Sequence, residues 1–137
     1  MKKTPEEHIE DILSVVDYAN EQDMVVNVYL EDWSNGMKHS PDYVFALMDA
    51  LKYMKIRRFM LPDTLGILNP LDLLGYIRKM VKRYPGVHFD FHAHNDYDLA
   101  ISNVLAAVLG VAGVSIPRST AWANGQGMPR WPVCRRY

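Results

Sequence analysis

Hydrophobic and polar residues follow two different periods along the chain. Stretches with apolar residues every three or four positions predict helices over residues 5–21, 41–54, 70–84 and 96–109. Short apolar runs bounded by turn residues predict buried strands over residues 24–30, 57–61 and 87–92. Residues 32–36, with the sequence Asp-Trp-Ser-Asn-Gly, are predicted to form a loop.

The predicted helices begin in a similar way. Thr4, Ser40 and Asn69 are each followed by proline, which is typical of a helix N-cap, and Glu7 completes a capping box with Thr4. Strand and helix repeat about every thirty residues, the size of a βα unit. The sequence therefore predicts an α/β fold with three to four βα units and parallel strands. A whole eight-stranded barrel needs about 250 residues, so we expect part of a (β/α)8 barrel or a small open sheet.

Composition excludes several classes of protein. The 137 residues are 49% hydrophobic and 23% charged, which suits one globular domain, and the net charge of −1 gives no field for binding nucleic acid. The single cysteine, Cys134, cannot form an intramolecular disulfide. No apolar run or leader indicates a membrane or secreted protein. We expect a cytoplasmic protein with no membrane partner.

Charge is distributed unevenly. All sixteen acidic residues lie in the first 98 positions, whose net charge is −5, whereas the residues after Asp98 carry four arginines and a net charge of +4. We therefore divide the chain into a domain over residues 1–114 and an aberrant basic tail over residues 115–137.

The third predicted strand carries the clearest chemical signal. Alternate side chains point to opposite faces, so His88, Asp90, His92 and His94 share one face. His92 and His94 lie at the C-terminal end, where α/β proteins place their sites, and two imidazoles at this spacing can bind one metal ion. A hydrogen-bonded histidine pair without metal is the alternative.

The two earlier strands also end in polar residues. Glu31 follows the first strand and can orient or deprotonate a substrate, although a solvated acid at the start of a loop is equally consistent. Asp63 and Thr64 follow the second strand, where ordinary turn chemistry is the alternative to a site.

Three motifs resemble one enzyme family. Residues 91–100 resemble the His-x-His-Asn-Asp signature of the superfamily of 2-isopropylmalate synthase, homocitrate synthase and HMG-CoA lyase. Residues 63–70 are similar to its Asp-Thr-x-Gly segment, and Leu30-Glu31-Asp32 to its acidic segment. The resemblance covers about residues 4–114 and is closest to 2-isopropylmalate synthase.

The resemblance implies a barrel that uses a divalent metal (Mn2+, Mg2+ or Zn2+) to join acetyl-CoA to a 2-oxo acid, as in leucine biosynthesis. By the match, His92 and His94 are metal ligands, Glu31 is catalytic and Thr64 contacts the substrate. Asp63 and Asp96 carry over as supports only. A lyase of the same superfamily and a half-barrel binding module without catalysis are the alternatives.

Two family segments have no counterpart in this sequence. These are the first strand, with its Asp-x-x-Arg-Asp-Gly motif, and the Gly-x-Gly-Glu-Arg-x-Gly-Asn segment that completes the metal site. Codons for residues 115–132 can be chosen so that another frame reads His-Thr-Thr-Val-Asn-Gly-Leu-Gly-Glu-Arg-Ala-Gly-Asn. We therefore infer a frameshift near codon 114, and the alternative is a functional basic tail.

The missing ligands and the open edges lead to two expectations. Two ligands of about four are too few for a competent site, so we expect the isolated chain to be inactive. Unpaired strand edges and uncovered apolar faces favour self-association, for example two copies completing one barrel.

Overall fold

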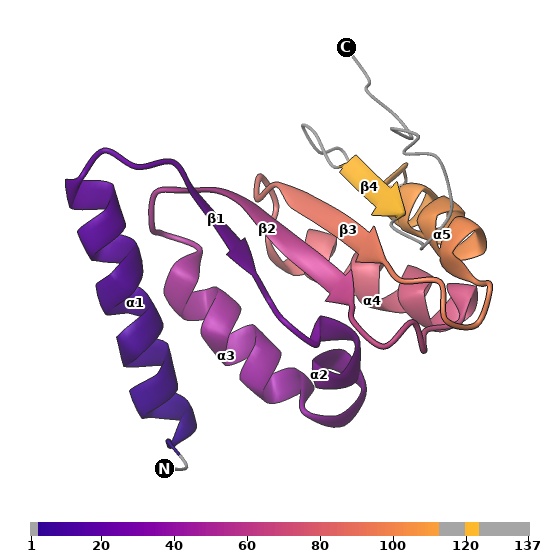
Figure 1. Cartoon of the computed structure of the whole chain (residues 1–137), viewed down its shortest axis with the longest axis horizontal. Coiled ribbons are helices and arrows are strands. Elements are labelled where there is room, and N and C mark those ends of the chain that lie inside the picture. The colour runs from indigo at the N-terminus through magenta and orange to yellow at the C-terminus, as the bar shows by residue number, and fades with distance from the viewer. Residues whose placement is uncertain (1–2, 113–119, 124–137) are drawn as a thin grey trace.

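The computed structural model describes residues 3–112 and 120–123 as a parallel sheet with its helices on one side. The elements are, in order, α1 (Pro5–Glu21), β1 (Val26–Tyr29), α2 (Trp33–His39), α3 (Pro41–Leu51), β2 (Ile56–Asp63), α4 (Pro70–Arg83), β3 (Phe89–Ala93), α5 (Ala100–Ala112) and β4 (Thr120–Ala123). The strands lie side by side in the order β1-β2-β3-β4, and every neighbouring pair is parallel (Figure 1). The α/β fold predicted from the sequence is confirmed.

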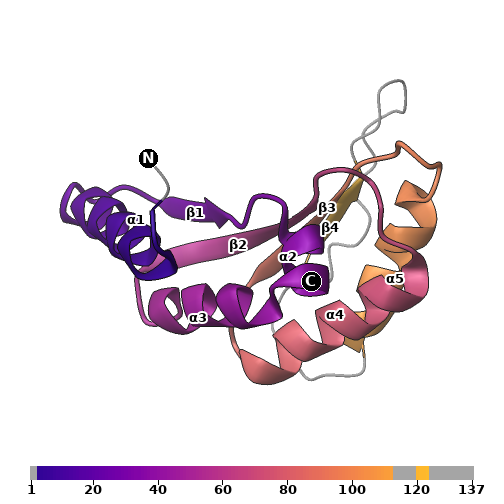
Figure 2. The same cartoon turned by 90° about the horizontal axis from the view of Figure 1, so that it is seen from below.

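The helices cover one face of this sheet. Figure 2 shows α2, α3, α4 and α5 beneath the strands, while α1 lies beside the edge formed by β1. Among the described residues, no helix covers the opposite face. This one-sided layering is that of a part of a (β/α)8 barrel, in which helices surround the sheet and its other face lines the interior.

The core lies between the sheet and the helices. Every second residue along β2 and β3 points toward the helices. On this face lie four buried residues, Phe59, Leu61, Phe89 and Phe91. The rings of Phe59 and Phe89 lie 6.2 Å apart on neighbouring strands. Because these residues face the helices, the residues between them on β3 face the barrel interior, as the alternation predicts.

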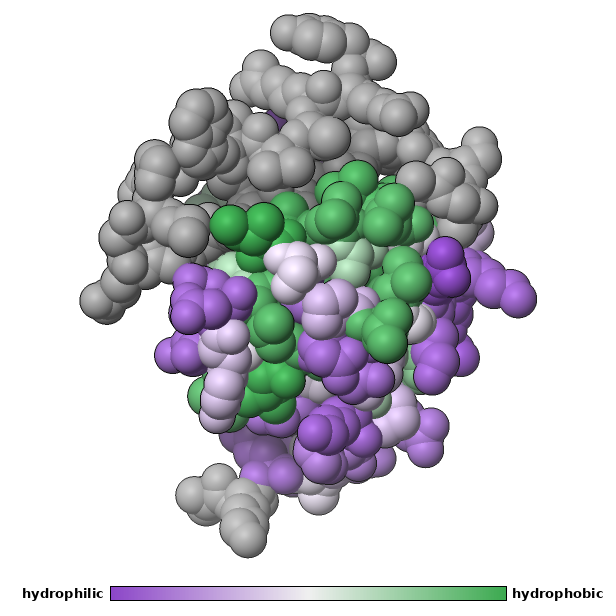
Figure 3. Space-filling model, turned by 90° about the vertical axis from the view of Figure 1, so that its right-hand side faces the viewer, coloured by the Kyte–Doolittle hydropathy of each residue, from purple (hydrophilic) through white to green (hydrophobic). Residues whose placement is uncertain are grey.

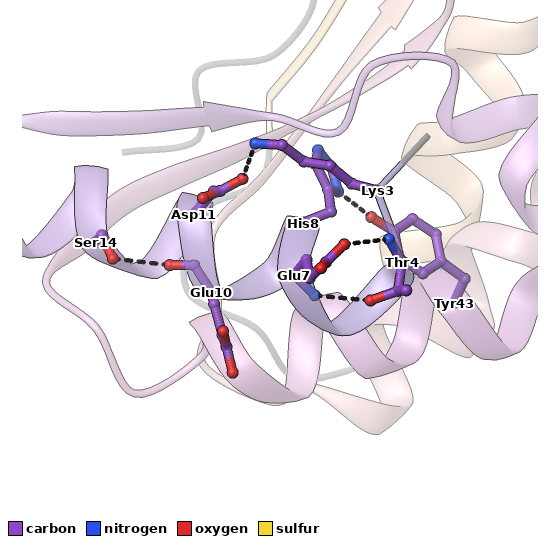
Figure 4. A network of polar contacts seen from close by, with 8 residues as sticks. All are labelled: Lys3, Thr4, Glu7, His8, Glu10, Asp11, Ser14 and Tyr43. Atoms are coloured by element: carbon purple, nitrogen blue, oxygen red, sulfur yellow. Dashed lines mark hydrogen bonds and ion pairs between the residues drawn. The ribbon is translucent and has the colours of Figure 1, made fainter. Parts of the chain in front are cut away.

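Two of the three predicted helix caps are confirmed. In α1, Glu7 N donates to Thr4 Oγ1 (3.2 Å) and Thr4 N donates to Glu7 Oε2 (2.8 Å), which completes the capping box (Figure 4). Asn69 Oδ1 accepts from Leu71 N and Asp72 N at the start of α4. Ser40 is also the N-cap residue of α3 and is followed by Pro41, but its side chain makes no capping hydrogen bond, so this prediction is confirmed in position only.

The prediction of a loop over residues 32–36, after the first strand, is also wrong in part. Residues 33–39 form the short helix α2, with Trp33 buried and Asp32 in a left-handed conformation (φ 58°) at its start. The indole of Trp33 packs edge-on against Tyr76 and Phe91, so tertiary burial overrides a composition typical of turns.

The proposed boundary between the domain over residues 1–114 and the tail lies outside the described ranges. Of the proposed tail over residues 115–137, only β4 is described, and it pairs with β3 through Asp90 to Ala93. The frameshift near codon 114 lies outside the described residues and stays a prediction. Within the described ranges, no helix is both long and apolar enough to span a membrane.

Candidate active site

Glu31 and Thr64 lie together after the C-terminal ends of β1 and β2. The Thr64 hydroxyl donates to Glu31 Oε1 (2.8 Å), and Thr64 Oγ1 accepts from the backbone N–H of Asp32 (3.1 Å). The pairing of β1 with β2 continues to Leu30, whose N–H donates to Met60 O (3.0 Å). The parallel register therefore brings these two predicted site residues from adjacent strands into direct contact.

His92 and His94 lie on the next strand at the same edge of the sheet. His92 pairs with Pro62 in the register of β2 with β3, and His94 directly follows Ala93, the last residue of β3. Their ring centres lie 5.0 Å apart, with the planes tilted by 43°. Both rings are half-buried.

The geometry of this pair fits two positions of a metal site. With a nitrogen-to-metal distance of about 2.1 Å, two imidazoles on one ion have ring centres roughly 4.6 to 5.3 Å apart, and the observed separation is 5.0 Å. Among residues 3–112 and 120–123, no three His, Cys, Asp or Glu side chains are grouped to hold a metal ion. Within the described residues, the metal-ligating groups at this position are therefore the two imidazoles of His92 and His94.

Electrostatics connect the histidine pair with Glu31. Burial lowers the pKa of His92, the neighbouring His94 lowers it further, and the Glu31 carboxylate acts in the opposite direction. The neutral imidazole that results is the form that binds metal ions and accepts protons. Glu31, Thr64, His92 and His94 thus share one edge of three neighbouring strands, as the sequence predicts.

Asp63 and Gly66 shape the loop that carries Thr64. The buried carboxylate of Asp63 accepts from Ile67 N (3.2 Å) and Leu68 N (3.1 Å), which closes the loop over the end of β2. Gly66 has φ +61°, and a Cβ there would stand 2.9 Å from Asp96 Oδ2. The loop after β2 therefore packs directly against the turn after β3.

A layer of polar residues lies below the histidine pair on the inward face of the sheet. Asp90 is completely buried, and its carboxylate contacts Arg58 Nη1 (2.9 Å) and His88 Nε2 (2.8 Å). Arg58 comes from β2 and therefore ties the two central strands together across the interior. This ion pair could not be identified from the sequence, because the alternation assigns a face to each residue but gives no register between strands.

Two asparagines support the same edge, one in the turn after β3 and one on α5. Asn95 Oδ1 accepts from Ala100 N (3.1 Å) at the start of that helix. Asn103 is buried and donates from Nδ2 to Leu68 O (2.8 Å), while its Oδ1 is among the buried polar atoms that find no partner within the described residues. Asn103 thus fastens α5 to the loop that carries Thr64, a role that the sequence reasoning missed because its helical position resembles an ordinary core position.

Curated proteins similar to this chain are homocitrate synthases. The protein from Sulfurisphaera tokodaii is 34% identical over 124 residues, which covers 90% of this chain and 25% of that protein. The protein from Saccharolobus islandicus strain L.S.2.15 is 32% identical over 126 residues, which covers 92% of this chain and 26% of that protein. The chain therefore spans about a quarter of the length of these relatives.

A solved structure and a family model agree with this architecture. The carboxyl transferase domain of Rhizobium etli pyruvate carboxylase superposes with a TM-score of 0.60 at 22% identity, over 84% of this chain and 19% of that one, which supports the fold alone. The model of the HMGL-like family matches residues 1–125, which is most of the sequence. With its parallel βα units and the polar residues gathered at one edge, the chain belongs to the HMGL-like family.

Proposed function

We propose that this chain forms part of a divalent-metal-dependent acyltransferase that condenses acetyl-CoA with a 2-oxo acid. The observation that carries the proposal is the cluster of Glu31, Thr64, His92 and His94 at the C-terminal edge of three parallel strands. Membership of the HMGL-like family and similarity to homocitrate synthases support the same reaction class. The 2-isopropylmalate synthase-like substrate, leucine biosynthesis and a cytoplasmic location stay predictions.

In this proposal His92 and His94 hold the metal ion. When bound, a divalent cation polarises a carbonyl oxygen and so makes its carbon more electrophilic. Burial and His94 keep His92 in the neutral form required of a ligand. Two imidazoles leave most coordination positions to other donors, so we expect the chain alone to bind metal weakly and to show no turnover.

Thr64 and Glu31 would act on the substrate as a hydrogen-bonded pair. The hydroxyl of Thr64 is oriented because it accepts from Asp32 N and donates to Glu31 Oε1. A substrate carboxylate that displaces Glu31 from this bond would receive the same donor. Glu31 would then be free to orient a polar group of the substrate or to take a proton from it.

Calorimetry with Mn2+ or Zn2+ tests the metal site. We expect weak binding to the unmodified chain and no binding to His92→Ala, because removing one of two imidazoles leaves a single ligand. His39→Ala is the matched control, since His39 is an exposed histidine at the end of α2. Equal binding by the unmodified chain and His92→Ala, or loss of binding in the control alone, would contradict the proposal.

A further inference from the structure

The turn between β1 and α2 contains a residue with an unusual backbone conformation. Asp32 has φ 58° and ψ 31°, which lies in the left-handed region. This region is unfavourable for residues other than glycine, and aspartate adopts it when its side chain can form a local hydrogen bond. Asp32 is exposed, so burial of its side chain does not hold it in this conformation. The hydrogen bonds of Asp32 therefore account for the left-handed turn.

The side chain of Asp32 is held by Asn35. Asn35 Nδ2 donates to Asp32 Oδ1 (2.9 Å) and to Asp32 Oδ2 (3.1 Å). The Asp32 carboxylate makes no capping hydrogen bond to the described backbone of α2, so it does not act as an ordinary helix cap. Asn35 belongs to α2, which is anchored because Trp33, Ser34 and Met37 are buried. The Asp32 carboxylate is therefore tied to a helix that is fixed in the core.

The backbone of Asp32 contacts the candidate site. Its N–H donates to Thr64 Oγ1 (3.1 Å), and the Thr64 hydroxyl donates to Glu31 Oε1 (2.8 Å). Because Thr64 Oγ1 accepts from Asp32 N–H, the hydroxyl proton points away from that N–H and toward Glu31. Since α2 is anchored, the φ angle of Asp32 determines where its N–H points. The left-handed turn therefore determines the direction in which Thr64 donates.

The turn after β3 repeats this arrangement. Asp98 is also left-handed (φ 57°), and Asn95 Nδ2 donates to Asp98 Oδ1 (3.2 Å). Each of the two pairs begins directly after a residue of the candidate site, because Asp32 follows Glu31 and Asn95 follows His94. The turn after β3 lies on the side of the molecule that Figure 3 shows, where polar side chains adjoin apolar ones. A left-handed aspartate bonded to an asparagine three residues away thus follows two of the strands that carry the site.

We propose that Asp32 is a positioning residue for Thr64. Its left-handed backbone directs its N–H to Thr64 Oγ1, and Asn35 maintains this conformation through the Asp32 carboxylate. The Thr64 hydroxyl is therefore oriented before a substrate carboxylate arrives, so binding does not have to immobilise it. The inference rests on the proposed role of Thr64 and Glu31 toward the substrate and is independent of metal binding.

The rotamer of Thr64 tests the positioning. Three-bond couplings to the Thr64 methyl carbon, measured by nuclear magnetic resonance on the metal-free chain, report its χ1 angle. We expect one rotamer in the unmodified chain and averaged couplings in Asp32→Ala, because alanine disfavours the left-handed backbone and gives Asn35 no acceptor. Asp32→Asn should restore the single rotamer, since asparagine tolerates this backbone and keeps an acceptor oxygen. Asn35→Ala should shift the couplings in the same direction as Asp32→Ala.

Asp23→Ala is the matched control for these couplings. Asp23 is also left-handed (φ 55°), its side chain is 97% exposed, and it precedes β1 instead of following it. We expect this variant to lose a left-handed aspartate in the same way and to leave the Thr64 couplings unchanged. Averaged couplings in the unmodified chain, unchanged couplings in Asp32→Ala, or an equal change in Asp23→Ala would overturn the proposal.

Hydrogen exchange of the Asp32 amide tests the same contact from the other side. Thr64→Val removes the acceptor of this N–H, so we expect its exchange to be about tenfold faster than in the unmodified chain. Thr64→Ser keeps the hydroxyl and should restore slow exchange. Equal exchange rates in Thr64→Val and Thr64→Ser would overturn the proposal. Failed metal calorimetry together with the expected couplings would refute the metal site and leave the positioning of Thr64 standing.

Discussion

His92 is the residue at which the strand pattern and the electrostatics of the site meet. Its ring lies 5.0 Å from that of His94, centre to centre. Burial and the second imidazole both favour its neutral form, so its pKa lies below the ordinary 6.5. Protonation of His92 therefore opposes folding, and the neutral form of His92 favours it. The stability that the neutral form contributes is complete above pH 6.5 and is lost as the pH falls from 6.5 toward the folded-state pKa.

Nuclear magnetic resonance titration of the imidazole carbons checks this assignment. We predict that His94→Gln raises the pKa of His92, because a positive neighbour is removed, and that Glu31→Gln lowers it further, because a negative neighbour is removed. Metal-free protein is used throughout. Shifts in the opposite directions would contradict this assignment, and an unchanged pKa of His92 in both variants would show that the three side chains do not interact.

The positions of the site residues could be predicted from the sequence, but their contacts could not. Period-two alternation and the ends of the strands indicated His92, His94, Glu31 and Thr64 without knowledge of the fold. The hydrogen bond between Thr64 and Glu31 depends on the register of β1 with β2. That register results from packing between distant segments, which a local pattern does not contain.

At the scale of elements, the strongly periodic segments were predicted well and the short ones poorly. The limits of α1 match the prediction, and the strands β1, β2 and β3 fall within or near their expected ranges. Helix α2 was missed because Asp32 and Gly36 are typical of turns. It forms because Trp33 and Met37 are buried and because Gly36 lets α2 approach α3, where a Cβ would stand 2.8 Å from Val44 Cγ2.

The loop over the end of β2 allows a matched test with two glycines. We predict that Gly66→Ala lowers the free energy of unfolding by about 1–3 kcal/mol, because the left-handed backbone resists a side chain and Asp96 occupies the space where the Cβ would lie. Gly75→Ala should raise it by about 0.5–1 kcal/mol, because alanine favours a helix and no atom lies within 4 Å of that Cβ.

Urea unfolding followed by circular dichroism measures both variants. A Gly66→Ala protein as stable as the unmodified chain would contradict the close packing of this loop against the turn after β3. A destabilised Gly75→Ala protein would contradict the open position of Gly75 on α4.

For the molecule as a whole, the important feature is a sheet with helices on one side and apolar surface at both ends. The α/β class and the parallel strands followed from the repeat of about thirty residues. The distribution of exposed apolar surface could not be predicted from the repeat, because the exposure of Val15 or Leu105 depends on which helices lie next to each other. Only the tertiary structure distinguishes an apolar helix face that is buried in the core from one that is exposed to solvent.

Thermal unfolding tests whether association contributes to stability. If folding and dimer formation are coupled, we predict that Tm rises by about 2 °C for each tenfold increase in chain concentration. Scanning calorimetry over two decades of concentration makes the measurement, and a constant Tm for the unmodified chain would contradict the coupling.

The sparse burial of α1 has a consequence for the order in which the protein comes apart. Val16 alone is buried on this helix, and the other apolar residues toward the sheet are only half-covered. Detaching α1 therefore exposes much less apolar surface than detaching α4, which buries Leu73, Ile77, Met80 and Val81. Its backbone amides should exchange with deuterated water through local opening, well before global unfolding, so the N-terminal helix should be less protected than α4.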